Sequence, residues 1–182
     1  MSIAYKPSDF TRSASPDLSK KKVLVIEDFA SFRHTLKHML RSFDITDVDD
    51  VATGEEAVAK IATKRYDIIL CDYNLGPGKD GQQLLEEIKY REFVNYSTIF
   101  MMITAENTMN MFLGAMEYQP DDYLMKPFTK GALEKKIRDL IKKKENVEEI
   151  DKAIEKKEFA RVIELCDQLI ANKVNNLSEV LK

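Results

Sequence analysis

Acidic, hydroxyl and basic side chains follow four short apolar or mixed runs of this 182-residue sequence. In chain order these residues are Glu27, Asp28, Asp72, Thr104 and Lys126. Crowded carboxylates repel one another, by about 4 kcal/mol for a pair 4 Å apart at an effective dielectric constant near 20, so they need a counter-ion. Oxygen donors without histidine or cysteine suit Mg²⁺, with Mn²⁺ as an alternative. The pattern therefore predicts a magnesium site beside a carboxylate nucleophile, with Lys126 and Thr104 able to contact phosphoryl oxygens.

The runs that precede these residues are typical of strands. Val23–Ile26, Ile68–Cys71 and Ile99–Ile103 are continuous apolar segments, too short for a helix and typical of strands buried on both faces. Residues 47–52 and 122–125 are weaker strand candidates.

Helical patterns alternate with the strands. Apolar residues recur three or four positions apart within residues 32–40, 57–62, 84–88, 109–116 and 133–141. Five β-then-α units predict an α/β fold, a doubly wound five-stranded parallel sheet covered by helices on both faces. The carboxyl ends of parallel strands meet at one edge, so the chemical residues should converge there. A strand-end aspartate alone is usually a helix cap, but four such features on four strands are much harder to explain by structure alone.

As an ordered set, these residues resemble the receiver domain of two-component response regulators. The matching residues are Glu27-Asp28, Asp72, Thr104-Ala105, Tyr123 and Lys126-Pro127-Phe128, within residues 21–144. The resemblance implies the flavodoxin-like strand order 2-1-3-4-5. The chain departs from the family at Gln119-Pro120, where Gly-Ala is common.

The resemblance also implies a role for each residue at the acidic edge. Asp72 resembles the phosphoacceptor. Asp28 and Asp72 resemble the side-chain metal ligands, Glu27 reaches the metal through water, and the backbone carbonyl of Asn74 is a further ligand.

The remaining matched residues resemble switch and tuning positions. Thr104 resembles the switch hydroxyl, Tyr123 the switch aromatic residue and Lys126 the phosphate-contacting lysine, and the bond before Pro127 should be cis. Asn74 and Glu106 lie two positions after Asp72 and Thr104, where polar side chains would tune dephosphorylation.

The implied function is that of a phosphorelay response regulator, which accepts a phosphoryl group from a histidine kinase or phosphotransfer protein and switches a protein-binding surface. Its chemistry would be limited to self-phosphorylation from small phosphodonors and slow autodephosphorylation, so we do not expect an enzyme.

A flavodoxin-like carrier is disfavoured because Glu27-Asp28 would repel the FMN phosphate. A haloacid-dehalogenase-type phosphatase needs Asp-x-Asp after the first strand, where this chain has Asp28-Phe29-Ala30. A phosphorylation-independent scaffold acting through C-terminal helical repeats is the remaining alternative.

The amino-acid composition excludes further classes of protein. Apolar residues make up 44% and charged residues 32%, and the net charge of −3 excludes a generally basic nucleic-acid binder. No apolar stretch is long enough for a membrane span, and we expect no signal peptide because residues 1–20 are polar and contain no apolar h-region. The two cysteines lie too far apart for a metal spacing, so we expect a reduced, cytoplasmic protein without a disulfide framework.

We expect the chain to divide into a flexible segment (1–20), a receiver domain (21–144) and a helical, tetratricopeptide-like segment (145–182). The charged run Lys142–Asn146 predicts a helix end, and a hairpin follows that is interrupted near 156–158 and again at Asn175-Asn176. Residues 147–176 weakly resemble one degenerate tetratricopeptide repeat; a plain amphipathic hairpin explains them equally well. One repeat cannot bury its own apolar face. The hairpin should therefore dock on the receiver, pair with another chain, or be followed by more of the natural chain past Lys182, and we favour the last of these.

The tail from Thr129 holds 13 Lys+Arg and 11 Asp+Glu without a helix-turn-helix pattern. We therefore expect the output to be a downstream protein partner bound by the helical segment, with no direct DNA binding.

Overall fold

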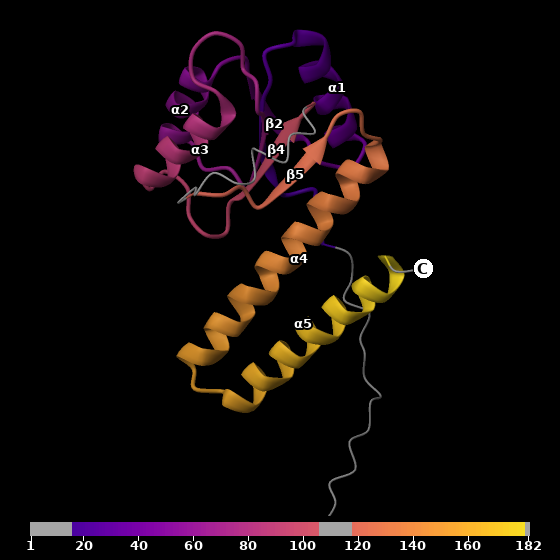
Figure 1. Ribbon diagram of the computed structural model, residues 1–182. Helices are drawn as coiled ribbons and strands as arrows, with labels where there is room; N and C mark the ends of the chain where they lie inside the picture. Colours follow the sequence, from indigo (N-terminus) through magenta and orange to yellow (C-terminus); the bar gives the residue numbers. More distant parts are fainter. Residues whose placement is uncertain (1–15, 106–117, 181–182) are drawn as a thin grey trace, which may run out of the picture.

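The computed structural model describes residues 16–105 and 118–180. A five-stranded parallel sheet with the order β2-β1-β3-β4-β5 forms its centre (Figure 1). The strands are β1 (Lys22–Ile26), β2 (Asp47–Val51), β3 (Ile68–Asp72), β4 (Ile99–Thr104) and β5 (Asp122–Met125). The helices are α1 (Ala30–Arg41), α2 (Gly54–Thr63), α3 (Gly81–Tyr90), α4 (Lys130–Glu155) and α5 (Phe159–Val180). The predicted fold class and strand order are confirmed, while the expected helix at 109–116 lies outside the described residues.

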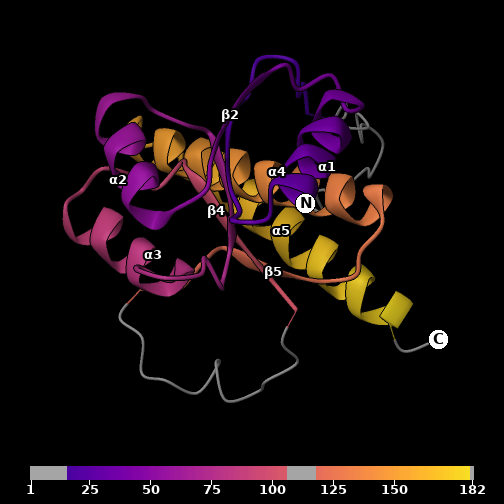
Figure 2. The ribbon, with the colours of Figure 1, turned by 90° about the horizontal axis from the view of Figure 1, so that it is seen from above.

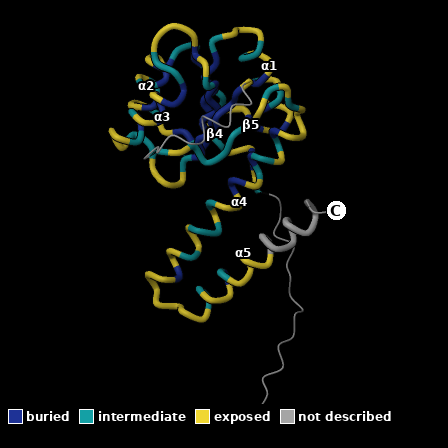
Figure 3. The backbone as a smooth tube through the Cα atoms, viewed as in Figure 1, coloured by how far each residue is buried: buried dark blue, intermediate teal, exposed yellow. Residues whose placement is uncertain are grey.

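Helices cover both faces of the sheet, and each face has its own apolar core. Alternate strand residues point to opposite faces, so Val23 and Val25 pack toward α1 and α4, whereas Leu24 and Ile26 pack toward α2 and α3. The two helix pairs lie on opposite sides of the strands (Figure 2). Burial is concentrated in the sheet, as the dark blue segments show (Figure 3). This double covering explains why the central strands are continuous apolar runs.

The strand register brings the ends of separate strands level with one another. Ile26 pairs with Cys71, so the residues that follow them, Glu27 and Asp72, lie side by side at the edge. On the other side of β3, Asp72 pairs with Ile103, and Thr104 comes next. Parallel pairing alone therefore gathers residues that are far apart in sequence.

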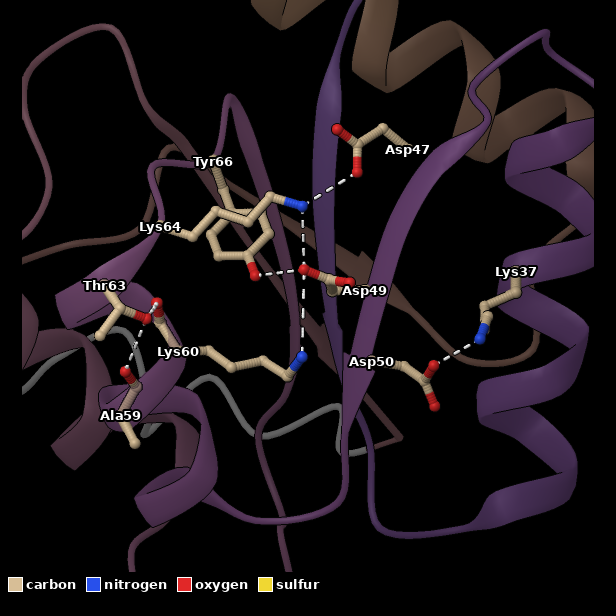
Figure 4. A network of polar contacts seen from close by, with 9 residues as sticks. All are labelled: Lys37, Asp47, Asp49, Asp50, Ala59, Lys60, Thr63, Lys64 and Tyr66. Atoms are coloured by element: carbon tan, nitrogen blue, oxygen red, sulfur yellow. Dashed lines mark hydrogen bonds and ion pairs between the residues drawn. The ribbon is translucent and has the colours of Figure 1, made fainter.

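Strand β2 is an acidic edge strand whose aspartates are neutralised by neighbouring helices (Figure 4). The Lys64 ammonium lies 3.0 Å from carboxylate oxygens of both Asp47 and Asp49. The hydroxyl of the buried Tyr66 donates to Asp49 at 2.6 Å, and Lys37 of α1 pairs with Asp50. Charged side chains on an edge strand also discourage pairing with another chain.

Helix α4 is longer than the sequence predicts. It continues without interruption through Lys142–Asn146, so the expected helix end there is wrong. The physical reason is a tertiary contact: the Lys144 ammonium lies 2.7 Å from the Asp121 carboxylate and donates to the Tyr96 carbonyl at 2.6 Å. The expected end of the receiver at residue 144 thus falls inside a continuous helix.

Helix α5 turns back along α4 to form the predicted hairpin (Figure 1). The turn spans residues 156–158, as expected, and Ala153 and Leu165 are buried between the helices. The second expected interruption, at Asn175-Asn176, is wrong because α5 runs to Val180. The propensity cost of asparagine in a helix is below about 1 kcal/mol, too small by itself to end one. Within the described ranges, neither of these helices, nor any other, combines the length and apolar character needed to cross a membrane.

Candidate functional site

Three carboxylates meet at the carboxyl edge of the sheet. Glu27 and Asp28 follow β1, and Asp72 is the last residue of β3. Each offers an oxygen that lies within 4.8 Å of the oxygens of the other two. Glu27 is only 1% exposed and Asp72 6% exposed, so this charge is held largely away from water. The convergence predicted from the sequence is confirmed for these residues.

Lys126 supplies a cation to this cluster from the end of β5. Its ammonium lies 2.8 Å from the Glu27 carboxylate and 2.9 Å from that of Asp72. The same ammonium sits over the Phe32 ring, 4.3 Å from its centroid. The Phe32 ring in turn meets Phe128 edge-on at 5.9 Å. Two carboxylates and an aromatic face therefore hold Lys126 toward the pocket.

The proton affinities of these groups reflect burial and close charge. Burial raises the pKa of Glu27 above its usual value; the Lys126 hydrogen bond opposes this shift, and the neighbouring Asp72 reinforces it. Burial disfavours the charged form of Lys126, but its hydrogen bonds with Glu27 and Asp72 outweigh this and raise its pKa. The pocket therefore retains a charged lysine among carboxylates that repel one another.

One oxygen of the pocket has no partner in the described part of the chain. Asp28 Oδ1 is buried and accepts no hydrogen bond from the described residues. A buried carboxylate oxygen without a hydrogen bond costs free energy, and coordination of a cation by that oxygen would offset the cost. An orphaned oxygen beside two further carboxylates, with no histidine or cysteine among the three, fits a hard divalent cation such as Mg²⁺. Asp28 and Asp72 would hold the ion directly and Glu27 through water.

The predicted switch residues occupy β4 and β5. Thr104 ends β4 and is buried, and its carbonyl accepts the Lys126 N–H at 2.7 Å. Tyr123 is half-buried and packs beside the core on the α2 and α3 face; burial, followed by the nearby Tyr73, raises its pKa. Their roles as a switch pair stay predictions.

One of the remaining predictions is confirmed, and the others are not tested. The peptide bond between Lys126 and Pro127 is cis, as predicted. Asn74 is exposed in the loop after β3, and its service as a carbonyl ligand stays a prediction. Glu106 lies outside the described residues. Sequence reasoning missed Phe32 as a neighbour of Lys126, because its spacing matched the apolar face of a helix, where it also packs.

Comparison with known proteins agrees with this geometry. The family model described as response regulator receiver domain matches residues 23–138, more than half of the chain. The chemotaxis protein CheY of Pseudomonas aeruginosa is 27% identical over 122 residues, which cover 67% of this chain and 97% of CheY.

Solved structures give the same result. The receiver domain of the sensor histidine kinase PA1611 from Pseudomonas aeruginosa PAO1, solved with a magnesium ion coordinated in its active-site cleft, is 30% identical with a TM-score of 0.59. It covers 66% of this chain and 97% of its own. The chemotaxis protein CheY4 of Vibrio cholerae is 27% identical with a TM-score of 0.59, covering 66% and 98% of the two chains. With this fold, this acidic edge and these relatives, the chain belongs to the response regulator receiver domain family.

Proposed function

We propose that this receiver is a phosphorelay response regulator that accepts a phosphoryl group on Asp72 from the phosphohistidine of a histidine kinase or phosphotransfer protein. The observation that carries the proposal is the meeting of Asp28, Asp72 and Lys126 at one edge, where a buried oxygen of Asp28 lacks a partner within residues 16–105 and 118–180. As a phosphoacceptor, the chain would turn over no substrate beyond small phosphodonors and its own phosphoryl group.

The transfer step is a displacement at phosphorus. A carboxylate oxygen of Asp72 attacks the phosphorus atom, a new O–P bond forms, and the P–N bond to the donor imidazole breaks with its electron pair on nitrogen. Lys126, which contacts Asp72 at 2.9 Å, would move its hydrogen bond to a phosphoryl oxygen. Thr104 would donate its hydroxyl to another phosphoryl oxygen and so report phosphorylation to β4. Attack of water on phosphorus would later break the O–P bond, release inorganic phosphate and restore the Asp72 carboxylate.

Mg²⁺, when bound, would neutralise charge on the transferring oxygens and align them. Asp28 would contribute a carboxylate that lies close to Asp72 and that forms no salt bridge with a lysine of the described residues.

Intact-mass analysis of the full chain with acetyl phosphate tests the proposal. With Mg²⁺, the wild type should gain the mass of one phosphoryl group, and removal of the metal with a chelator should abolish the gain. Asp72→Asn should show none. Asp49→Asn, a matched loss of one carboxylate on β2, should be phosphorylated normally. A phosphorylated Asp72→Asn variant, or a wild type that stays unmodified in both conditions, would reject the proposal.

For the output, we propose a protein partner bound by the α4–α5 hairpin. Phe159, Ile163 and Ile170 lie on one side of α5 and are 64%, 63% and 62% exposed, while Leu165 packs toward α4. The same surface favours the second candidate function, a scaffold that does not depend on phosphorylation. Affinity purification with wild type and Asp72→Asn separates the two: partner recovery that depends on phosphorylation supports the switch, and equal recovery supports the scaffold.

A further inference from the structure

Helix α1 begins beside the acidic pocket without a capping side chain. Its N-cap residue is Phe29, whose side chain makes no cap hydrogen bond, whereas Thr53, Asp80 and Thr129 cap α2, α3 and α4. A capping side chain normally fixes the backbone that enters a helix. The segment 27–29, which carries two of the three pocket carboxylates, therefore depends on contacts from elsewhere.

Arg33, one turn into α1, makes those contacts. Its Nη1 donates to the carbonyl oxygen of Glu27 at 2.5 Å and to that of Asp28 at 3.3 Å. The peptide unit between Asp28 and Phe29 is held at its other end as well, because the Phe29 N–H donates to the Glu27 carboxylate at 3.2 Å. Since a peptide unit is planar, holding its C=O and its N–H fixes its orientation. That orientation sets the direction in which the Asp28 side chain leaves the backbone.

Arg33 is itself anchored by strand β2. Its Nε donates to Asp50 Oδ2 at 3.0 Å, and Lys37 pairs with the other oxygen of Asp50. The side chains of Arg33 and Asp50 are only 19% and 30% exposed. A guanidinium can bond a carboxylate and two carbonyls at once because its donors lie in a rigid plane, and a lysine ammonium cannot reproduce this geometry.

We propose that Arg33 is a positioning residue for the metal site, which holds the backbone of Glu27 and Asp28 so that the Asp28 carboxylate faces the cation. Arg33 acts through the backbone and is not a ligand. The inference rests on the proposed function, since the bound cation it concerns is the Mg²⁺ of the phosphoryl-transfer site.

The direction in which Mg²⁺ affinity changes when Arg33 is replaced distinguishes a positioning role from an effect of its charge. A guanidinium near the pocket repels a divalent cation, so its loss through charge alone would tighten Mg²⁺ binding. Loss of positioning would weaken binding instead, because supporting residues around a metal typically contribute about 10- to 100-fold in affinity. Arg33→Lys keeps the charge and removes the planar contacts, and so tests positioning directly.

The experiment is isothermal titration of Mg²⁺ into the full chain at fixed ionic strength, for wild type, Arg33→Lys, Arg33→Met, Asp50→Asn and Lys37→Met. We expect both Arg33 variants to bind about tenfold more weakly than wild type. Asp50→Asn should weaken binding by a smaller factor, since Arg33 keeps its carbonyl contacts. Lys37 pairs with the same Asp50 but makes no hydrogen bond to segment 27–29 among the described residues. The Lys37→Met variant should therefore bind Mg²⁺ no more weakly than wild type.

Urea unfolding of each variant without Mg²⁺ provides the second measurement. Unchanged Mg²⁺ affinity in Arg33→Lys, tighter binding in Arg33→Met, or equal weakening in Lys37→Met would each overturn the inference. A lower urea midpoint with unchanged affinity would also overturn it, because Arg33 would then act on stability alone. If Arg33→Met does not fold, Arg33→Lys and Asp50→Asn decide the question. If the wild type binds no Mg²⁺, the proposed function itself is rejected. If the wild type binds Mg²⁺ and Arg33→Lys binds it with the same affinity, only the inference about Arg33 is rejected.

Discussion

Two groups of three acidic residues in the described part of the chain differ in how their charge is balanced. Asp47, Asp49 and Asp50 on β2 each pair with at least one lysine (Figure 4). The other group, the pocket of Glu27, Asp28 and Asp72, has Lys126 as the only cation in a salt bridge with it among the described residues.

The difference separates a structural cluster from a reactive one. The β2 aspartates are partly exposed and satisfied, so they stabilise an edge strand and its contacts with α1 and α2. The pocket carboxylates are more buried, and one Asp28 oxygen lacks a partner among the residues that the structure describes. Acidic composition alone does not distinguish a metal site from a neutralised surface; the balance of nearby donors does.

The largest effect should follow from removing the pocket's lysine. Lys126→Met leaves the carboxylates of Glu27 and Asp72 buried without their shared partner, which should lower the free energy of unfolding by about 3 kcal/mol. Urea denaturation without Mg²⁺ measures this loss. Lys64→Met, which removes the lysine of the more exposed β2 pairs, should cost less than about 1 kcal/mol. Equal losses in the two variants would erase the distinction between the clusters.

Next in size is the response to metal. Asp28→Asn should weaken Mg²⁺ binding by at least about tenfold, since it replaces a charged ligand. Without metal, the same variant should be slightly more stable, because one charge leaves a repelling group. Calorimetric titration and urea unfolding measure the two effects. Metal affinity that survives Asp28→Asn unaltered would place the ion elsewhere.

The matched change on β2 should give the opposite pattern. Asp49→Asn weakens the hydrogen bonds from Lys64 and Tyr66, and should destabilise the protein by about 1 kcal/mol. Its Mg²⁺ affinity should equal that of wild type, because Asp49 lies outside the pocket. An Asp49→Asn variant that binds Mg²⁺ more weakly would show that the two clusters act together.

The smallest expected effect is a pH dependence on the acid side. The hydrogen bonds from Tyr66 and Lys64 lower the pKa of Asp49 in the folded protein. A lowered pKa contributes stability that is complete above the unfolded value near pH 3.9 and is lost as the pH falls through the folded pKa. The stability difference between wild type and Asp49→Asn should therefore shrink below about pH 4. Urea midpoints across pH measure this, and a difference that stays constant would contradict the assignment.

Much of the fold was predictable because its signals are local. Short buried runs such as Ile68–Cys71 identify strands, and the polar residue after each run identifies the chemical edge once the sheet is parallel. The pocket residues Asp28, Asp72 and Lys126 were predicted for that reason.

The missed features depend on contacts between distant segments. The charged run after residue 141 indicates a helix end by composition, yet Lys144 is only 13% exposed because it pairs with Asp121. Arg33 gave no signal because the partners that it holds at the pocket are backbone carbonyls, which carry no mark in the sequence, and its side-chain partner Asp50 lies 17 positions away on strand β2. The spacing of Phe32 predicts only the apolar face of a helix, because nothing in the sequence indicates that the Lys126 ammonium lies over its ring.

The most direct test of the account is the location of a bound divalent cation. Crystals soaked in Mn²⁺, which scatters anomalously and takes the same oxygen donors as Mg²⁺, should show one strong anomalous peak in contact with Asp28 and Asp72. No peak should appear at Asp47, Asp49 or Asp50. A peak on β2, or none between Asp28 and Asp72 at a Mn²⁺ concentration that saturates binding in solution, would contradict the account.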